Sequence, residues 1–434
     1  MPTPRRRGRA AAASVLTTAL LCSVWTGGAA GAATAPPGGT TADATGRPAD
    51  AVKPAMPSAK APAPVAKSAD PSPTSAPAAL YGREDPSRDG VYRQSLAITA
   101  LASTDTTPAP AAIEWLLGQQ CADGGFTAYR ADPNVPCDPA REDTASTAAA
   151  IEALAALRTY DTRAARGAQW LRATQLADGS FAAVPGPDAV GDPTSTASAI
   201  SALVAARTDP ELVKSPQGRT PTAALVETQA GCAAPPPVQG SFGAAPGDPL
   251  ASARATLALA YGTRPTEAAA SASVTPLTCP GAPPSRVVAA QGGAAWLIGA
   301  LRDGGNHVGG PTDFDATAAA VQALSATGHP TEAGTAADWL AAGAKTMAGN
   351  DPVRLASLIL AAQTTGRTVT TFGGLDLPVL LAATGPAPAA TPDLLEQGNT
   401  VDGPEDHTLR DTIAAVVAVL LGATLIVGMR RRSE

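Results

Sequence analysis

The feature that most constrains the fold is a repeat of two short segments between about residues 85 and 384. One segment carries Trp-Leu and then a glycine turn, as in RGAQWLRATQLADGSF (Arg166–Phe181) and AIEWLLGQQCADGGF (Ala112–Phe126). The other begins with an acidic residue and continues as an Ala-rich stretch, as in EDTASTAAAIEALAAL (Glu142–Leu157). Asp, Ser and Thr cap helix starts by accepting bonds from free backbone N–H groups. We therefore expect a series of helical hairpins.

Further copies of both segments follow along the chain. The Trp-Leu residues begin at Trp115, Trp170, Trp296 and Trp339, and the later acidic starts are Asp192, Asp248, Asp313 and Asp351. A half-unit, Gly90–Ala102, opens the series. The Ala-rich segments are apolar nearly all round, which is typical of buried helices, whereas the Trp segments are more amphipathic. Units that cannot bury their own apolar face stack into an array or a ring. The sequence leaves open whether the ring closes.

Both ends of the chain have the composition of targeting and tethering segments. Residues 1–33 run from basic to apolar to small residues, as a signal peptide does. We interpret the rest as an Ala/Pro-rich disordered linker at 34–86, a helical ring at 87–384, a juxtamembrane linker at 385–411, a transmembrane helix at 412–429 and a cytoplasmic tail at 430–434. The arginines after residue 429 favour a cytoplasmic end. We therefore expect a single-pass protein of the cell membrane, with the ring outside the cell.

The net charge and the cysteines limit which ligands, metals and macromolecules the chain is expected to bind. The formal net charge is −6, which argues against nucleic-acid binding. An even number of cysteines outside the cell favours disulfides. Three pairings of these cysteines are possible, and closeness in sequence favours Cys121–Cys137 and Cys232–Cys279. No CxxC spacing indicates a metal site, and we expect no cofactor.

The spacing of the Trp segments resembles a known motif. Trp170, Gln175, Gly179 and Phe181 are similar to the QW motif of the prenyltransferase and squalene-cyclase (squalene-oxidase) repeat superfamily. The segment at Ala112–Phe126 matches it almost as well, and the later copies keep less of it. The resemblance implies an all-α fold, an α/α toroid with the Trp helices outside and the Ala-rich helices inside. It also implies that the motif glutamines tie neighbouring outer helices together. With the predicted tether, the chain resembles a surface-anchored repeat protein of actinobacterial type.

One activity that the resemblance implies is class II terpene cyclisation. Such enzymes protonate an alkene with the middle Asp of a DxDD motif, and Asp313-Phe314-Asp315-Ala316 resembles that motif with its last Asp replaced. Asp315 would be the general acid, and like-charge repulsion from Asp313 would help to raise its pKa. A helix cap explains the same residues. Aromatic residues make up 3% of the chain, and most occupy repeat positions, so few remain to shelter a carbocation.

Other members of the superfamily suggest binding rather than catalysis. A protein prenyltransferase needs a zinc site of Asp, Cys and His, whereas this chain has three histidines and cysteines that we expect to be oxidised. Cobalamin carriers, which resemble this fold, hold a ligand at the open end of the ring. We therefore expect a non-catalytic ring that binds a small molecule, corrinoid-like ligands included, or a protein partner, with a terpenoid cyclase as the alternative. The predicted ligand-binding residues lie at the starts of inner helices: Glu142, Asp143, Thr144, Asp313, Asp315 and Thr317.

Overall fold

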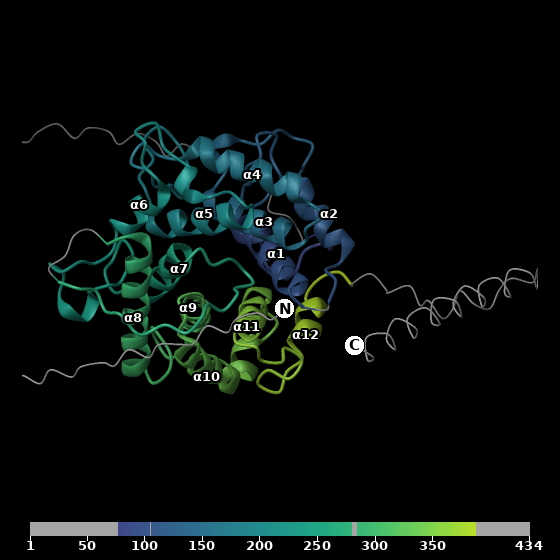
Figure 1. Cartoon of the computed structure of the whole chain (residues 1–434). Helices are drawn as coiled ribbons and strands as arrows, with labels where there is room; N and C mark the ends of the chain where they lie inside the picture. The colour runs from purple at the N-terminus through teal and green to yellow at the C-terminus, as the bar shows by residue number, and fades with distance from the viewer. Residues whose placement is uncertain (1–76, 105, 280–283, 388–434) are drawn as a thin grey trace, which may run out of the picture. The chain divides into compact units, whose positions relative to one another are not determined.

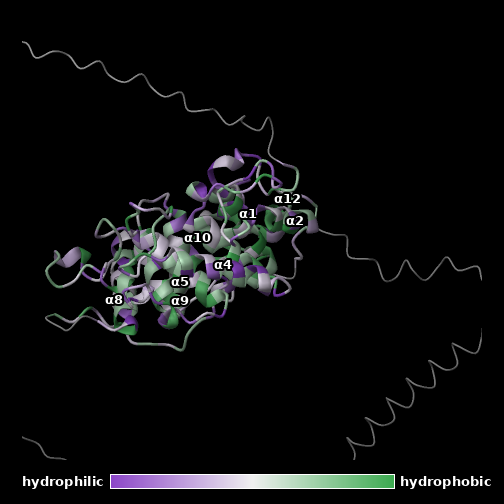
Figure 2. Cartoon of the chain, turned by 90° about the horizontal axis from the view of Figure 1, so that it is seen from above, coloured by the Kyte–Doolittle hydropathy of each residue, from purple (hydrophilic) through white to green (hydrophobic). Residues whose placement is uncertain are grey.

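The computed structural model describes residues 77–104, 106–279 and 284–387, and its regular structure in these residues is helical (Figure 1). The predicted signal peptide, membrane helix and cytoplasmic tail lie outside the described residues. Within the described part, none of the helices has the length and apolar character needed to cross a bilayer. Figure 2 shows apolar residues gathered along the helices and many polar residues in the connecting loops.

Six of the described helices form an inner ring. They are α1 (Pro86–Ala102), α3 (Thr144–Ala156), α5 (Pro193–Ala205), α7 (Pro249–Leu259), α9 (Phe314–Ala326) and α11 (Pro352–Thr364). Each packs against the next, and α11 packs against α1, so the ring closes. A closed ring gives every inner helix two inner neighbours, which explains why these helices are apolar nearly all round.

The outer helices each cover the inner helix that precedes them in the chain. They are α2 (Pro110–Gln119), α4 (Asp161–Thr174), α6 (Pro221–Val226), α8 (Arg286–Gly304), α10 (Pro330–Ala348) and α12 (Leu377–Ala383). Three short 3₁₀ turns, η1 (Pro139–Arg141), η2 (Pro210–Leu212) and η3 (Pro236–Val238), lie in the connections. The Trp-Leu residues fall on outer helices and the Ala-rich segments on inner ones, as the repeat predicts. The all-helical ring is therefore confirmed.

Every inner helix begins at an aspartate whose side chain accepts backbone N–H bonds of the first turn. The six caps are Asp85, Asp143, Asp192, Asp248, Asp313 and Asp351. Four of these helices also have a proline in the first turn, which suits a helix start because no intrahelical bond is lost there. The acidic starts of the repeat are thus explained by helix capping.

The glycine turns hold neighbouring outer helices together. The side-chain amide of Gln120 donates to Gly124 O at 3.1 Å and to Arg163 O, on α4, at 3.0 Å. Gln175 makes the equivalent bonds one hairpin further on. Gly124 has φ +108°, and a Cβ there would lie 2.4 Å from Arg166 O. The turn therefore requires glycine both for its backbone angle and for its close approach to α4.

The ring begins earlier than the linker prediction placed it. Residues 77–86 are described, and Leu80 and Tyr81 are buried. Gln94 of α1 holds this segment, since its side chain accepts from Tyr81 N at 2.9 Å and donates to Ala79 O at 3.0 Å. Two large side chains in a Pro-rich segment are a weak sequence signal, and the sequence assigned residues 77–86 to the linker predicted at 34–86.

Both predicted disulfides are present. Cys121–Cys137 closes a loop of separation 16, and Cys232–Cys279 spans a separation of 47. The second bond ties the connection after α6 to the long connection between α7 and α8. That long connection also enters the centre of the ring.

Candidate functional site

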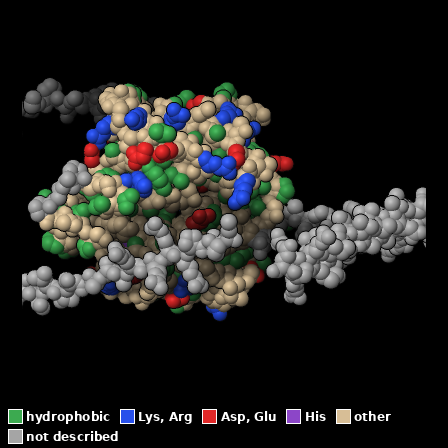
Figure 3. Space-filling model, in the orientation of Figure 1, with side chains coloured by type: hydrophobic (Ala, Val, Ile, Leu, Met, Phe, Trp, Pro, Cys, Tyr) green, Lys and Arg blue, Asp and Glu red, His purple; other side chains and the backbone are tan. Residues whose placement is uncertain are grey.

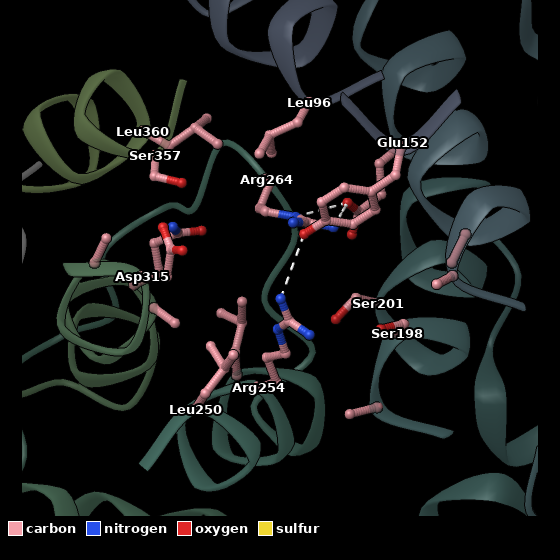
Figure 4. Close-up of a pocket in the computed structure, with 18 of the residues that line it drawn as sticks. Leu96, Glu152, Ser198, Ser201, Leu250, Arg254, Arg264, Asp315, Ser357 and Leu360 are labelled. Atoms are coloured by element: carbon pink, nitrogen blue, oxygen red, sulfur yellow. Dashed lines mark hydrogen bonds and ion pairs between the residues drawn. The ribbon is translucent and has the colours of Figure 1, made fainter. Parts of the chain in front are cut away.

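The inner helices surround a cavity of about 170 Å³. All six inner helices contribute to its wall, and the connection between α7 and α8 adds one residue, Arg264. Its polar lining consists of Tyr92, Glu152, Ser198, Ser201, Arg254, Arg264, Asp315, Gln322 and Ser357 (Figure 4). On the face seen in Figure 3, a hollow with acidic side chains lies over the middle of the molecule. The cavity is the candidate site because it gathers polar groups in an otherwise apolar, Ala-rich interior.

An ion pair occupies one side of the cavity. The Arg264 Nε donates to Glu152 Oε2 at 2.7 Å, and its Nη2 also contacts that oxygen. The Glu152 side chain is 2% exposed and that of Arg264 is 18% exposed. Burial raises the pKa of the Glu152 carboxyl, and the positive charge of Arg264 partly opposes this. The pair fastens a loop residue to α3 across the interior of the ring.

A second guanidinium lies next to this pair. Arg254 of α7 donates from Nη2 to the Tyr92 hydroxyl at 3.3 Å (Figure 4). Burial alone raises the pKa of the Tyr92 hydroxyl, but the positive charges of Arg254 and Arg264 outweigh it, so the pKa lies below its ordinary value. Among the described residues, no carboxylate forms an ion pair with Arg254. Arg254 acts on the nearby Glu152 and Asp315 carboxyls through its charge alone, lowering the pKa of each, so most of its N–H donors are left without an acceptor among the described residues.

Asp315 lies on another side of the cavity, on the first turn of α9 (Figure 4). The pKa of its carboxyl is raised, first by burial and then by repulsion from Asp351, while Arg354 and Arg254 pull it down. Repulsion from Asp313 is the smallest of these causes. Gln322, two turns further along α9, lines the same cavity, and its Oε1 is buried without a hydrogen-bond partner. This side of the cavity is thus rich in acceptors.

The other predicted ligand-binding residues do not line the central cavity. Asp313 caps α9, and Thr317 bonds the Val308 backbone and Asp313 O. The Thr144 hydroxyl donates to Ala182 O at 2.6 Å, in the next turn. Asp143 caps α3 and lines a separate hollow on the surface. Only Asp315 of the six predicted residues lies in the wall of the cavity.

Glu142 occupies a buried position in the turn before α3. It is 2% exposed, and its carboxylate lies within 4.8 Å of the sulfur atoms of Cys121 and Cys137. Because these cysteines are joined, they are not thiolate ligands for a metal. Burial and repulsion from Asp123 raise the pKa of Glu142 to about 7. Glu142 is therefore a buried acid of the scaffold that does not line the cavity.

Sequence reasoning missed most of the cavity. Arg254 and Glu152 carried a usable signal, since each is a charged residue in the middle of a helix that is otherwise apolar. Gln322 carried a similar but weaker one. Arg264 carried none, because it lies in the connection that follows α7, where no periodicity predicts which side chain turns inward.

The two histidines of the described part, His307 and His329, each contact another side chain of the scaffold. His307 stacks on Trp339 with ring centres 4.7 Å apart, and His329 Nε2 lies 3.0 Å from Gln291 Oε1. Neither joins a cluster of metal-ligating side chains among the residues that the structure describes. The third, His407, lies outside the described residues.

Comparison with known proteins adds little to this geometry. No protein-family model matches the chain, and no curated protein matches it either. It is similar to the solved structure of ent-copalyl diphosphate synthase from Streptomyces platensis, with 22% identity over 64% of this chain and 50% of that chain, at a TM-score of 0.41. The match thus spans half the length of the synthase. A protein from Actinoplanes is similar at 20% identity over 60% of this chain and 72% of that chain, at a TM-score of 0.37. Similarities this low carry no argument, and the ring stands on its own contacts.

Proposed function

We propose that this chain is a cell-surface binding protein, held by one C-terminal membrane helix, whose helical ring binds a small molecule or a protein partner without catalysing a reaction. The observation that supports this most is the set of charged and polar side chains in the wall of the central cavity. Glu152 pairs with Arg264, so Arg254 is the guanidinium whose N–H donors remain for an anionic group of a ligand. Of the residues that line this cavity, Tyr92 alone is aromatic. Such a cavity suits a polar ligand better than a carbocation, which aromatic faces stabilise.

The size of the cavity bears on the ligand. Sites for drug-sized ligands usually measure roughly 300–1,000 Å³, and this cavity measures about 170 Å³. A small polar molecule fits that volume, whereas a corrinoid would have to lie over an open end of the ring. We therefore favour a small ligand inside the ring, and place a corrinoid or a protein partner at its rim as the other forms of the same binding role.

Native mass spectrometry of the full chain, released from its host membrane in detergent, tests the binding role. We expect a retained small molecule, or uptake of one from host metabolite and lipid extracts. Ala319→Phe fills space in the cavity wall and should abolish retention, whereas Val379→Phe, at an exposed position on α12, should not. A bare mass in every condition would contradict small-molecule binding and leave only the protein partner.

Asp315 supports a second candidate, a terpenoid cyclase. Its carboxyl lines the cavity and its pKa is raised by burial, as a general acid requires. If the ring is a cyclase, the full chain should convert a linear prenyl substrate to a cyclic product, and Asp315→Asn should abolish that product. Asp313→Asn, which keeps an oxygen to cap α9, is the matched control and should retain activity. Product formation by the Asp315→Asn protein would eliminate Asp315 as the acid.

A further inference from the structure

The cavity has two chemically opposite walls, and they lie on neighbouring helices. Arg254 of α7 presents a guanidinium, and Asp315 and Gln322 of α9 present acceptor oxygens. α7 packs directly against α9 in the ring. In Figure 4, Arg254 and Asp315 project from separate helices toward a common space.

The positive wall is incompletely paired. A guanidinium carries five N–H donors, and the one acceptor that the described residues offer Arg254 is the Tyr92 hydroxyl at 3.3 Å. The hydroxyls of Ser198 and Ser201, on the adjacent α5, line the cavity beside it (Figure 4). Guanidinium groups bind carboxylates through two parallel hydrogen bonds. A ligand carboxylate would therefore supply acceptors for the N–H donors of Arg254 that have none among the described residues.

The acceptor wall is also incompletely paired. Gln322 is 5% exposed, and its Oε1 is buried without a donor. A buried acceptor left without a partner is unfavourable, so a donor from a ligand in the cavity would stabilise this oxygen. Asp315 lies seven residues earlier on the same helix and faces the same cavity. A ligand ammonium group would supply donors to both and would offset the charge of Asp315.

From these two walls we infer that the ring binds a small zwitterion of the amino-acid class, with its carboxylate on Arg254 and its ammonium group between Asp315 and Gln322. The inference rests on the proposed binding role and specifies its ligand. The volume of about 170 Å³ suits a molecule of this size. The Arg264–Glu152 pair lies next to Arg254 and stays intact in this arrangement, since the ligand carboxylate would use N–H donors of Arg254 and not those of Arg264.

Calorimetric titration of the full chain tests the ligand class. The probes are glycine, β-alanine and γ-aminobutyrate, which differ in the spacing of their charges, together with the nineteen common L-α-amino acids. Propylamine and propionate each carry one of the two charged groups. We expect at least one zwitterion to bind at least tenfold more tightly than either single-charge analogue. Equal or undetectable binding of all probes would overturn the inference and would indicate a cavity filled by water.

Substitutions assign the two ends of the ligand. Arg254→Met should weaken binding of the zwitterion at least tenfold and leave binding of propylamine unchanged. Asp315→Asn should also weaken binding of the zwitterion at least tenfold, but leave binding of propionate unchanged. Arg302→Met, at an exposed arginine on α8, is the matched control and should bind as the unaltered chain does. Arg254→Gln also removes the charge and serves as a second variant if Arg254→Met fails to fold. Zwitterion binding that survives both Arg254 variants and Asp315→Asn would overturn the assignment.

The two proposals fail in different ways. A retained molecule without an ammonium or a carboxylate group, found by native mass spectrometry, would support the binding role and overturn the zwitterion. Binding of a zwitterion probe would support both. If no molecule is retained and no probe binds, both are overturned for small ligands.

Discussion

The repeated turns and the central cavity differ in how their polar side chains find partners. In the turns, the same side-chain bonds recur along the chain: an aspartate caps each inner helix, and the amides of Gln120 and Gln175 donate to the following hairpin. In the cavity, contacts such as the Arg264–Glu152 ion pair and the Arg254–Tyr92 hydrogen bond each occur once. The difference teaches that repetition marks the scaffold in this chain, and that departures from it mark the candidate site.

The largest expected loss of stability comes from removing Arg264, whose ion pair occurs once in the ring. Arg264→Met leaves the Glu152 carboxylate buried without its cation. Breaking a buried ion pair in this way typically costs roughly 3–5 kcal/mol, and urea denaturation should show a loss of that order. The double variant Arg264→Met, Glu152→Gln removes both charges and should recover most of the loss. If Arg264→Met unfolds at the same urea concentration as the unaltered chain, the pair is not a structural anchor.

The next test changes a glycine turn of the repeated scaffold. Gly124→Ala forces a side chain onto a residue with φ +108° and places its Cβ 2.4 Å from Arg166 O. Backbone strain of this kind costs on the order of 1–3 kcal/mol, and the close contact adds to it. Gly218→Ala is the control, because Gly218 has φ +77° but no atom within 4 Å of the new Cβ. Equal melting temperatures for the two variants would show that the contact between turn and outer helix contributes nothing.

A buried acid of the scaffold gives a test by pH. The pKa of Glu142 is about 7 in the folded chain, against an ordinary value of 4.5. Between these values the folded chain holds more protons than the unfolded one, so this residue makes the free energy of unfolding fall as pH rises. Glu142→Gln should remove that dependence and stabilise the domain at pH 8 by up to about 3 kcal/mol. Glu114→Gln, at an exposed carboxylate on α2, is the control, and a matching pH profile for both would contradict the expectation.

The smallest expected effect concerns the glutamine ties. The Gln175 amide donates to Gly179 O at 2.9 Å and to Arg219 O at 3.4 Å, so Gln175→Ala removes two hydrogen bonds. A net loss of about 1–2 kcal/mol follows from typical hydrogen-bond contributions. Gln175→Glu keeps the shape but loses the donors, and should cost at least as much. A loss confined to the alanine variant would show that packing, and not donation, explains the motif glutamine.

The sequence predicted the scaffold well because its rules are local. A capping aspartate, a turn glycine and an Ala-rich helix each act within a few residues, and each recurs, so hairpins, layers and disulfides could be anticipated. Ring closure and the cavity depend on residues far apart. Arg264 and Glu152 meet over a separation of 112 residues, and no local pattern reports that contact. The acidic helix starts could not be assigned roles from the sequence for the same reason. Capping and catalysis both use aspartate, and only the fold shows that Asp313 caps α9 whereas Asp315 lines the cavity.

Ring closure brings the two ends of the described chain together. Gly82 donates to Thr384 O at 2.9 Å, and α12 packs against α1 as well as α11. In a closed ring, each hairpin keeps the same two neighbours wherever the chain begins. The position of the termini is therefore not needed to define the fold. A gene that joined residue 387 to residue 77 and opened the exposed loop near Gly186 would encode a circular permutant with every hairpin contact intact. Such a permutant would begin and end between α4 and α5 instead of beside α1 and α12, and so would present its termini on a different part of the ring.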